Sequence, residues 1–195
     1  MHKYAKRLAE LGMEPPEETP LCDIYQIEKA TGVKLPKPYR TFLQKCGDWW
    51  GDVLCPALEP TPFGEHVMCG VHSADSVYGL LDSMITPRNM ITIGSGHFGA
   101  FTCLSIAGID RGAVYALDSE FRSRWPDSRF QEKFNAMADS INDYLKLRAD
   151  GKLPDKHDSY DSVYLLANDF DAFLARCHLP DSEEGEPDDA RESLS

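Results

Sequence analysis

Residues 90–118, MITIGSGHFGAFTCLSIAGIDRGAVYALD, decide the fold. Short apolar runs rich in β-branched and aromatic residues alternate there with glycine and aspartate, as in strands joined by turns. The last part, IAGIDRGAVYALD, predicts a hairpin in which a turn bearing glycine and aspartate joins two strands. Because no helix-length segment separates the runs, we expect an antiparallel sheet and not parallel strands linked by helices.

Two earlier runs of the same kind, VLCPAL at 53–58 and HVMCGVH at 66–72, extend the predicted sheet toward the N-terminus. Segments whose apolar residues recur every three or four positions flank the sheet on both sides, which predicts helices. These helices are expected over about 4–11, 21–31, 38–46, 128–149 and 161–177. The order predicts an α+β fold: a mostly antiparallel β-sheet packed against N- and C-terminal helices.

The 195 residues suit a single domain, which we place at 1–179, followed by an acidic disordered tail at 180–195. Seven acidic residues and one arginine lie within 181–195, where apolar residues are too few for a packed core. The formal net charge of −12 disfavours binding to nucleic acid or to anionic membranes and favours a basic protein partner. Solubility alone explains this charge equally well.

The start of the chain and its cysteines predict a cytoplasmic protein. The opening MHKYAKRLAELG is basic but lacks the apolar core of a secretory signal. No run reaches the roughly 18 apolar residues that a membrane span requires. Cysteines at 22, 46, 55, 69, 103 and 177 are scattered, several at apolar positions, which predicts buried thiols in a reducing compartment. A disulfide framework is the alternative.

The glycine-rich stretch at 94–99, GSGHFG, has the spacing of a dinucleotide-binding loop. That function requires a helix to begin there, so that its amide groups face the phosphates. The residues that follow, AFTCLSI, favour a strand, which predicts a turn between two strands. A nucleophile elbow at Ser95 fails as well, because Ile93 stands where that motif needs glycine.

Two further sets of residues could carry chemistry. His66, Cys69 and His72 are of the types that bind zinc, but in a strand the three would not share one face. Cys103 with His97 could form a cysteine nucleophile and its base, although a buried thiol is the commoner state of a strand cysteine. We therefore predict no catalytic residues, no metal site and no cofactor.

The adjacent tryptophans of CGDWWGD are the strongest candidate for partner contact. Two neighbouring indoles in a loop cannot easily both be buried, so we expect one in the core and one exposed among acids. The predicted partner-binding residues are Asp48, Trp49, Trp50, Asp52, Glu59 and Glu65.

Four stretches resemble the SUKH superfamily over about 21–147. IEKATGVKLPKPYRTFLQKCG at 27–47 resembles its opening signature, and ITIGSGHFGAFTCLSI at 91–106 is similar to its glycine-rich strand pair. IDRGAVYALDSE at 109–120 resembles its hairpin, and MADSINDYLKL at 137–147 resembles its closing helix. Their order and spacing together make the resemblance specific.

The sequence departs from the family pattern in three places. The expected glycine pair is Gly47-Asp48, Ile141 replaces a phenylalanine after Ser140, and the helix at 161–177 and the acidic tail are additions. These departures put a shared binding surface in doubt. The matching motif residues have the character of core and turn positions: Leu35, Pro36, Tyr39, Phe42, Leu43, Gly47, Gly94, Gly99, Gly112 and Tyr115.

The resemblance implies an α+β fold with no catalytic residues to transfer. Bacterial members of the superfamily are immunity proteins that bind and neutralise a cognate toxin of a polymorphic toxin system, whereas eukaryotic members are regulators and hubs. The leading hypothesis is therefore an immunity protein that occludes a basic toxin domain. The alternatives are a regulatory or scaffold module that acts on an endogenous protein, and an enzyme or metal-binding protein that would use the histidines and cysteines above.

Overall fold

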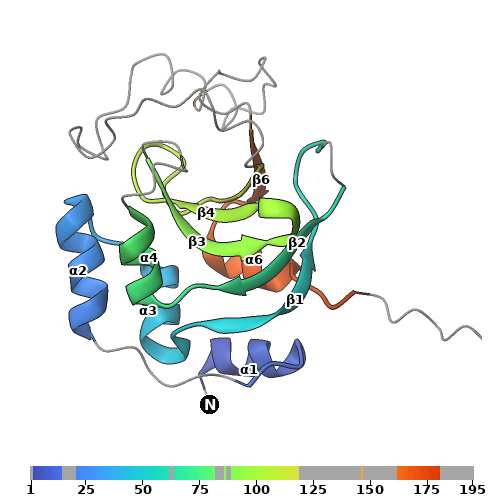
Figure 1. Cartoon of the computed structure of the whole chain (residues 1–195), viewed down its shortest axis with the longest axis horizontal. Coiled ribbons are helices and arrows are strands. Elements are labelled where there is room, and N and C mark those ends of the chain that lie inside the picture. The colour runs from blue at the N-terminus through green and yellow to red at the C-terminus, as the bar shows by residue number, and fades with distance from the viewer. Residues whose placement is uncertain are drawn as a thin grey trace, which may run out of the picture.

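The computed structural model describes residues 2–14, 21–61, 64–81, 86, 89–118, 146 and 162–180. Within these residues, six antiparallel strands form one sheet in the order in which they occur along the chain (Figure 1). The strands are β1 (Trp49–Cys55), β2 (His66–Val71), β3 (Met90–Gly96), β4 (Phe101–Ser105), β5 (Val114–Leu117) and β6 (Val163–Ala167). The predicted α+β fold class is confirmed.

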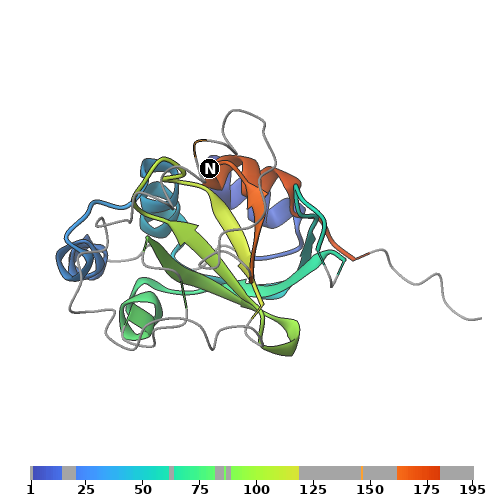
Figure 2. The ribbon, with the colours of Figure 1, turned by 90° about the horizontal axis from the view of Figure 1, so that it is seen from above.

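Helices cover one face and one end of this sheet. The helices α1 (Lys3–Glu10), α3 (Lys37–Cys46) and α6 (Phe170–Arg176) lie together on one face, as the view from above shows (Figure 2). The helices α2 (Leu21–Thr31) and α4 (Ala74–Leu80) pack against each other at one end of the sheet (Figures 1 and 2). In β1, the burial pattern alternates in part, with Trp49 and Val53 buried and Trp50 and Asp52 exposed.

The apolar side chains divide into two cores because successive strand residues point to opposite faces. In β5, Val114 and Ala116 face the helices and join the main core, whereas Tyr115 and Leu117 belong to a second core on the other face. The centre of the main core is aromatic, with Tyr39, Phe42, Phe170 and Phe173 fully buried. The second core contains Met90, Cys103, Ala113, Tyr115, Leu117 and Val163.

The sheet is curled, and each of its two edge strands receives a neighbouring segment. Beside β1, Leu54 exchanges two backbone hydrogen bonds with His178, of 2.8 and 2.9 Å. Beside β6, the amide of Leu58 donates to the carbonyl of Leu165 at 2.7 Å, and the amide of Leu165 donates to a carboxylate oxygen of Glu59 at 2.6 Å. These contacts satisfy polar groups that an open edge strand would offer to another chain.

The first and last described helices are joined by polar contacts. The hydroxyl of Tyr4 donates to Asp171 at 2.7 Å, and the ammonium group of Lys3 donates to the second oxygen of this carboxylate at 2.7 Å. Burial, followed by this hydrogen bond, raises the pKa of Tyr4. The guanidinium group of Arg7 donates to the carbonyls of Leu174, Ala175 and Cys177, which the end of α6 leaves without helical partners. The contacts therefore fasten the end of α6 to α1.

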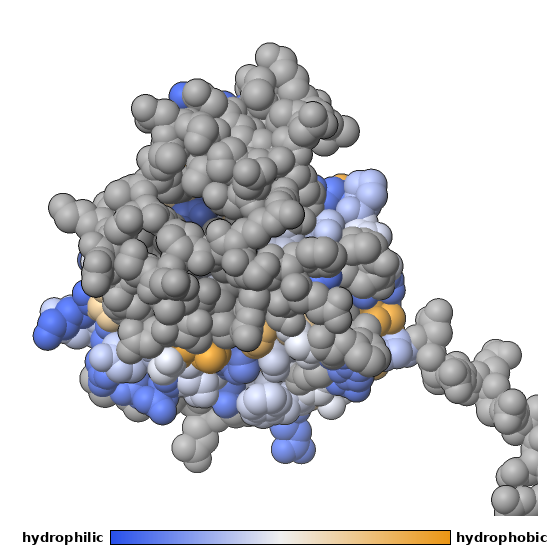
Figure 3. Space-filling model, turned by 45° about the horizontal axis from the view of Figure 1, so that its top comes forward, coloured by the Kyte–Doolittle hydropathy of each residue, from blue (hydrophilic) through white to orange (hydrophobic). Residues whose placement is uncertain are grey.

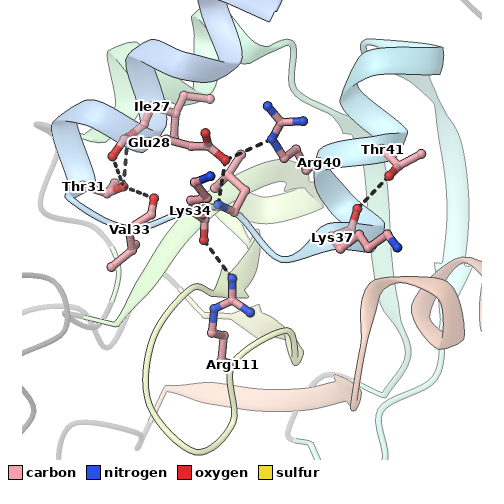
Figure 4. A network of polar contacts seen from close by, with 10 residues as sticks. Ile27, Glu28, Thr31, Val33, Lys34, Lys37, Arg40, Thr41 and Arg111 are labelled. Carbon is pink, nitrogen blue, oxygen red and sulfur yellow. Dashed lines mark hydrogen bonds and ion pairs between the residues drawn. The ribbon is translucent and has the colours of Figure 1, made fainter.

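The loop between α2 and α3 is built around one carboxylate (Figure 4). Glu28 accepts hydrogen bonds of 3.1 Å from the amide of Leu35 and from Nε of Arg40. Gly32, whose φ of 70° favours glycine, follows the end of α2, and the guanidinium group of Arg111 donates to the carbonyl of Lys34 at 2.9 Å. Much of the signature at 27–47 is thus a set of loop-fixing contacts.

Two predictions about helices were wrong. Residues 161–177 do not form one helix, because Leu166 belongs to β6 and α6 begins at Phe170, after Asp169 accepts a capping hydrogen bond from the amide of Ala172. A helix, α4, does lie between β2 and β3, although these strands remain antiparallel. The predicted helix at 128–149, apart from Lys146, and the acidic tail lie outside the described residues.

Candidate partner-binding surface

The two adjacent tryptophans do not lie in a loop, as predicted, but begin strand β1, whose alternation places them on opposite faces. Trp49 is 2% exposed and packs edge-on against Phe42 in the main core, with ring centroids 6.0 Å apart. Trp50 is 64% exposed, the largest exposed fraction among the big apolar side chains of the described residues. The expectation that one indole is buried and the other exposed agrees with this geometry.

Two glycines allow the strands beneath Trp50 to approach closely. Gly70 lies opposite Trp50 across the β1–β2 pair, and a Cβ atom there would be 2.5 Å from the carbonyl oxygen of Trp49 and 3.1 Å from the indole ring of Trp50. A Cβ atom at Gly94 would be 2.4 Å from the carbonyl oxygen of Gly70. Both distances to oxygen are too short for any side chain, so both positions require glycine. At Gly70, the absence of a side chain also leaves room for the indole of Trp50.

His72 contacts this indole, and two carboxylates, Asp48 and Asp52, are its near neighbours along the chain. The ring of His72 meets the ring of Trp50 edge-on, with centroids 6.1 Å apart. Burial lowers the pKa of His72, and the nearby carboxylate of Asp48 partly opposes this effect, so His72 is neutral at pH 7. Nε2 of His97 lies 3.3 Å from a carboxylate oxygen of Asp52. We call the set Asp48, Trp50, Asp52, His72 and His97 the Trp50 surface.

The six predicted partner-binding residues do not all lie on the Trp50 surface. Asp48, Trp50 and Asp52 belong to it, whereas Trp49 is a core residue. Glu59 is half-buried and accepts the hydrogen bond from the amide of Leu165, so its carboxylate serves the edge of the sheet. Glu65 is exposed, and its carboxylate lies 3.6 Å from Nε2 of His178 at the other side of β1.

His72 and His97 were missing from the prediction. They are 22 and 47 residues from Trp50 in the sequence. Only the pairing of β1 with β2 and of β2 with β3 brings His72 beside Trp50 and His97 beside Asp52. The one available signal was that HVMCGVH, a predicted strand, ends in His72. Its register against β1, which places Gly70 opposite Trp50, depends on a bulge between Trp50 and Val53.

The structure shows where the motifs with possible catalytic or metal-binding chemistry lie. The stretch at 94–99 ends β3 and forms a short 3₁₀ turn, and β4 begins at Phe101, so a strand follows the glycines as predicted. Cys103 is buried in the second core, whereas His97 is exposed beside Asp52. Among the residues that the structure describes, no group of three or more histidine, cysteine or acidic side chains could hold a metal ion.

The large apolar side chains that are exposed among the described residues are Tyr25, Trp50, Leu58, Tyr78, Ile109 and Leu179. On the face shown in Figure 3, the described residues are mostly hydrophilic, and the hydrophobic ones occur in small separate groups. Within the described part of the chain, no helix is both long and apolar enough to cross a membrane. The exposed indole of Trp50, which lies over Gly70 and between Asp48 and Asp52 in the sequence, is therefore the most distinctive surface feature of the described residues.

These features define a class of protein: an α+β domain in which helices cover one face of an antiparallel sheet and an exposed tryptophan lies on β1. The sequence profile of the SMI1 / KNR4 family (SUKH-1) matches residues 21–147, and the chain belongs to this family. A comparison with curated proteins gave no match. The helix α1, the strand β6 and the helix α6 lie outside the matched residues, yet β6 pairs with β5 and extends the same sheet.

Proposed function

We propose that this protein is a non-catalytic immunity protein that binds and neutralises a cognate toxin domain, and that the Trp50 surface contacts a basic segment of the toxin. Membership of the SUKH-1 family supports an immunity-type function. The observation that carries the proposed contact is the exposed indole of Trp50 between Asp48 and Asp52.

The chemistry of this surface suits a lysine or arginine side chain of the partner. A cation over an indole face gains about 0.5–2 kcal/mol, depending on how far it is desolvated. Carboxylates beside the ring add attraction to the same cation, and a net charge of −12 accelerates the encounter with a basic domain. The close approach of Gly70 reduces the conformational entropy that the indole loses on binding, because Trp50 already packs against the backbone of β2.

The experiment measures binding of the purified protein to the toxin domain encoded beside it, for wild type and for Trp50→Ala. We expect Trp50→Ala to weaken binding by about 2 kcal/mol, roughly thirtyfold, as for a central aromatic anchor. The matched control is Tyr25→Ala, because Tyr25 is 62% exposed on α2 and lies outside the Trp50 surface. This control should retain the wild-type affinity.

The electrostatic part of the proposal has a separate test. Asp48→Asn with Asp52→Asn should lower the association rate at low salt and leave it nearly unchanged at high salt, because exposed charges act through a screened field. Equal association rates of the wild type in low and high salt would remove this part. A pull-down that returns endogenous proteins and no toxin would replace the immunity function by the regulatory or scaffold alternative.

A further inference from the structure

The backbone contact beside β1 places two distant cysteines directly opposite each other. Leu54 and His178 exchange both of their backbone hydrogen bonds in an antiparallel bridge. The next pair in this register is Cys55 and Cys177, which forms no backbone hydrogen bond between its members. Pairs of this kind have Cα atoms about 4.5 Å apart and side chains closer than at hydrogen-bonded pairs.

Both thiols point into the same core. Cys55 and Cys177 are fully buried members of the main core, and neither is in a disulfide. The neighbouring thiol of Cys55, together with burial, raises the pKa of Cys177. The thiol of Cys177 also lies 3.3 Å from the carbonyl of Phe173, to which it donates. A disulfide requires Cα atoms about 4.4–6.8 Å apart with Cβ atoms facing each other, which this pairing supplies.

Two other cysteines that are not in a disulfide, Cys46 and Cys103, have different surroundings. Cys46 lies in α3, near Tyr4, and Cys103 lies in the second core on the opposite face of the sheet. Among these four cysteines, Cys55 and Cys177 are the two that a strand register sets opposite each other. Their separation in sequence, 55 to 177, gives no hint of this pairing.

We propose that Cys55 and Cys177 form a redox site, in which a low-molecular-weight disulfide such as oxidised glutathione converts the two thiols into an intramolecular disulfide. Because both thiols are buried in the folded core, the exchange takes place while the chain folds, before the core closes over them. The thiolate of one cysteine attacks the glutathione disulfide, forms a mixed disulfide and releases one reduced glutathione. The thiolate of the second cysteine then attacks the protein sulfur of the mixed disulfide and releases the second glutathione. The two cysteines lose two protons and two electrons, and one oxidised glutathione becomes two reduced ones.

Oxidation of this pair changes the mechanics of the sheet. In the reduced protein, the Leu54–His178 bridge is the backbone pairing that joins the segment after α6 to β1, while Arg7 holds the carbonyl of Cys177 from α1. A covalent link makes this contact permanent and closes a loop that contains β2 to β6. Because a long closed loop restricts the unfolded chain, the oxidised protein unfolds at a higher denaturant concentration than the reduced one. This inference does not rest on toxin binding.

The test allows a disulfide to form between any two of the six cysteines. The reduced, unfolded full chain is refolded in buffers with graded ratios of oxidised to reduced glutathione, free thiols are alkylated, and disulfide-linked peptides are identified by mass spectrometry without reduction. We expect the Cys55–Cys177 link to exceed every other pairing by about tenfold, because the native register holds these two sulfurs together. Cys46→Ala should leave the link intact, whereas Cys55→Ala should abolish it.

Two results would overturn the proposal. One is a different predominant pairing, or six free thiols at every glutathione ratio. The second is a lower urea midpoint for the oxidised wild type than for the reduced wild type, which would mean that the native backbone does not accommodate the bond. Both measurements use the wild-type chain, so they stand even if a cysteine variant fails to fold.

Discussion

Glu28 provides the sharpest test of how the family signature stabilises the fold. Its side chain is 9% exposed and accepts hydrogen bonds from the amide of Leu35 and from Nε of Arg40 (Figure 4). Glu28→Ala removes the oxygen that accepts both hydrogen bonds and leaves the helix propensity of α2 favourable. Glu28→Gln keeps one oxygen for the amide of Leu35 but removes the charge.

The expected cost follows from what each donor loses. Leu35 is 3% exposed, so its amide cannot be fully rehydrated, and an unsatisfied buried donor costs about 1–3 kcal/mol. The side chain of Arg40 is 35% exposed, so water replaces its lost partner and the ion pair contributes only about 0–1 kcal/mol. We therefore expect Glu28→Ala to lower the free energy of unfolding by about 2–3 kcal/mol, and Glu28→Gln by about 1 kcal/mol.

Urea denaturation followed by circular dichroism measures these free energies. The control is Gln26→Ala, an exposed position on the same helix, which should change the free energy of unfolding by less than about 0.5 kcal/mol. A Glu28→Ala variant as stable as this control would refute the reasoning, because the loop would then hold its shape without the carboxylate.

Two further predictions concern the tryptophans and the clasp between α1 and α6. Trp49→Ala should lower the free energy of unfolding by about 3 kcal/mol, because it opens a cavity beside Phe42. Trp50→Ala should change this free energy by less than about 0.5 kcal/mol, because Trp50 is exposed. If urea denaturation gave equal losses of stability for the two variants, the assignment of the two indoles to opposite faces would be wrong. At Asp171, burial would raise the pKa, but hydrogen bonds from Lys3 and Tyr4 outweigh it and lower the pKa below its ordinary value of 3.8. The stabilisation by this carboxylate is thus present at neutral pH and is lost as the pH falls below 3.8. The difference in melting temperature between wild type and Asp171→Asn should therefore shrink below this pH. A difference in melting temperature that stays constant with pH would contradict this prediction.

Much of the fold was predictable from local patterns. The helices at 21–31 and 37–46 begin and end where proline, glycine and the apolar spacing indicate, and the strands of 90–118 follow the glycine-punctuated runs. The helix α4 was missed because it is short and contains Gly79. The error at 161–177 arose because Leu166 fits the helical spacing by chance, while the capping by Asp169 marks the true start of α6.

The candidate site was only partly predictable, because it depends on contacts across strands. The sequence could show that one indole of the pair had to be exposed, and Asp48 and Asp52 are its neighbours in the chain. It could not show that His72 and His97 lie beside them, nor that Glu59 instead binds the amide of Leu165.

By itself, the sequence determined most of the helices and strands up to residue 118, the family and the acidic character of the protein, because these properties depend on residues near one another in the chain. The tertiary structure alone decided the composition of the Trp50 surface, the closure of the sheet edges and the pairing of Cys55 with Cys177. Strand register is the physical reason. A shift of one residue exchanges the two faces of a strand, and bulges such as the one between Trp50 and Val53 set this register through packing of the whole sheet.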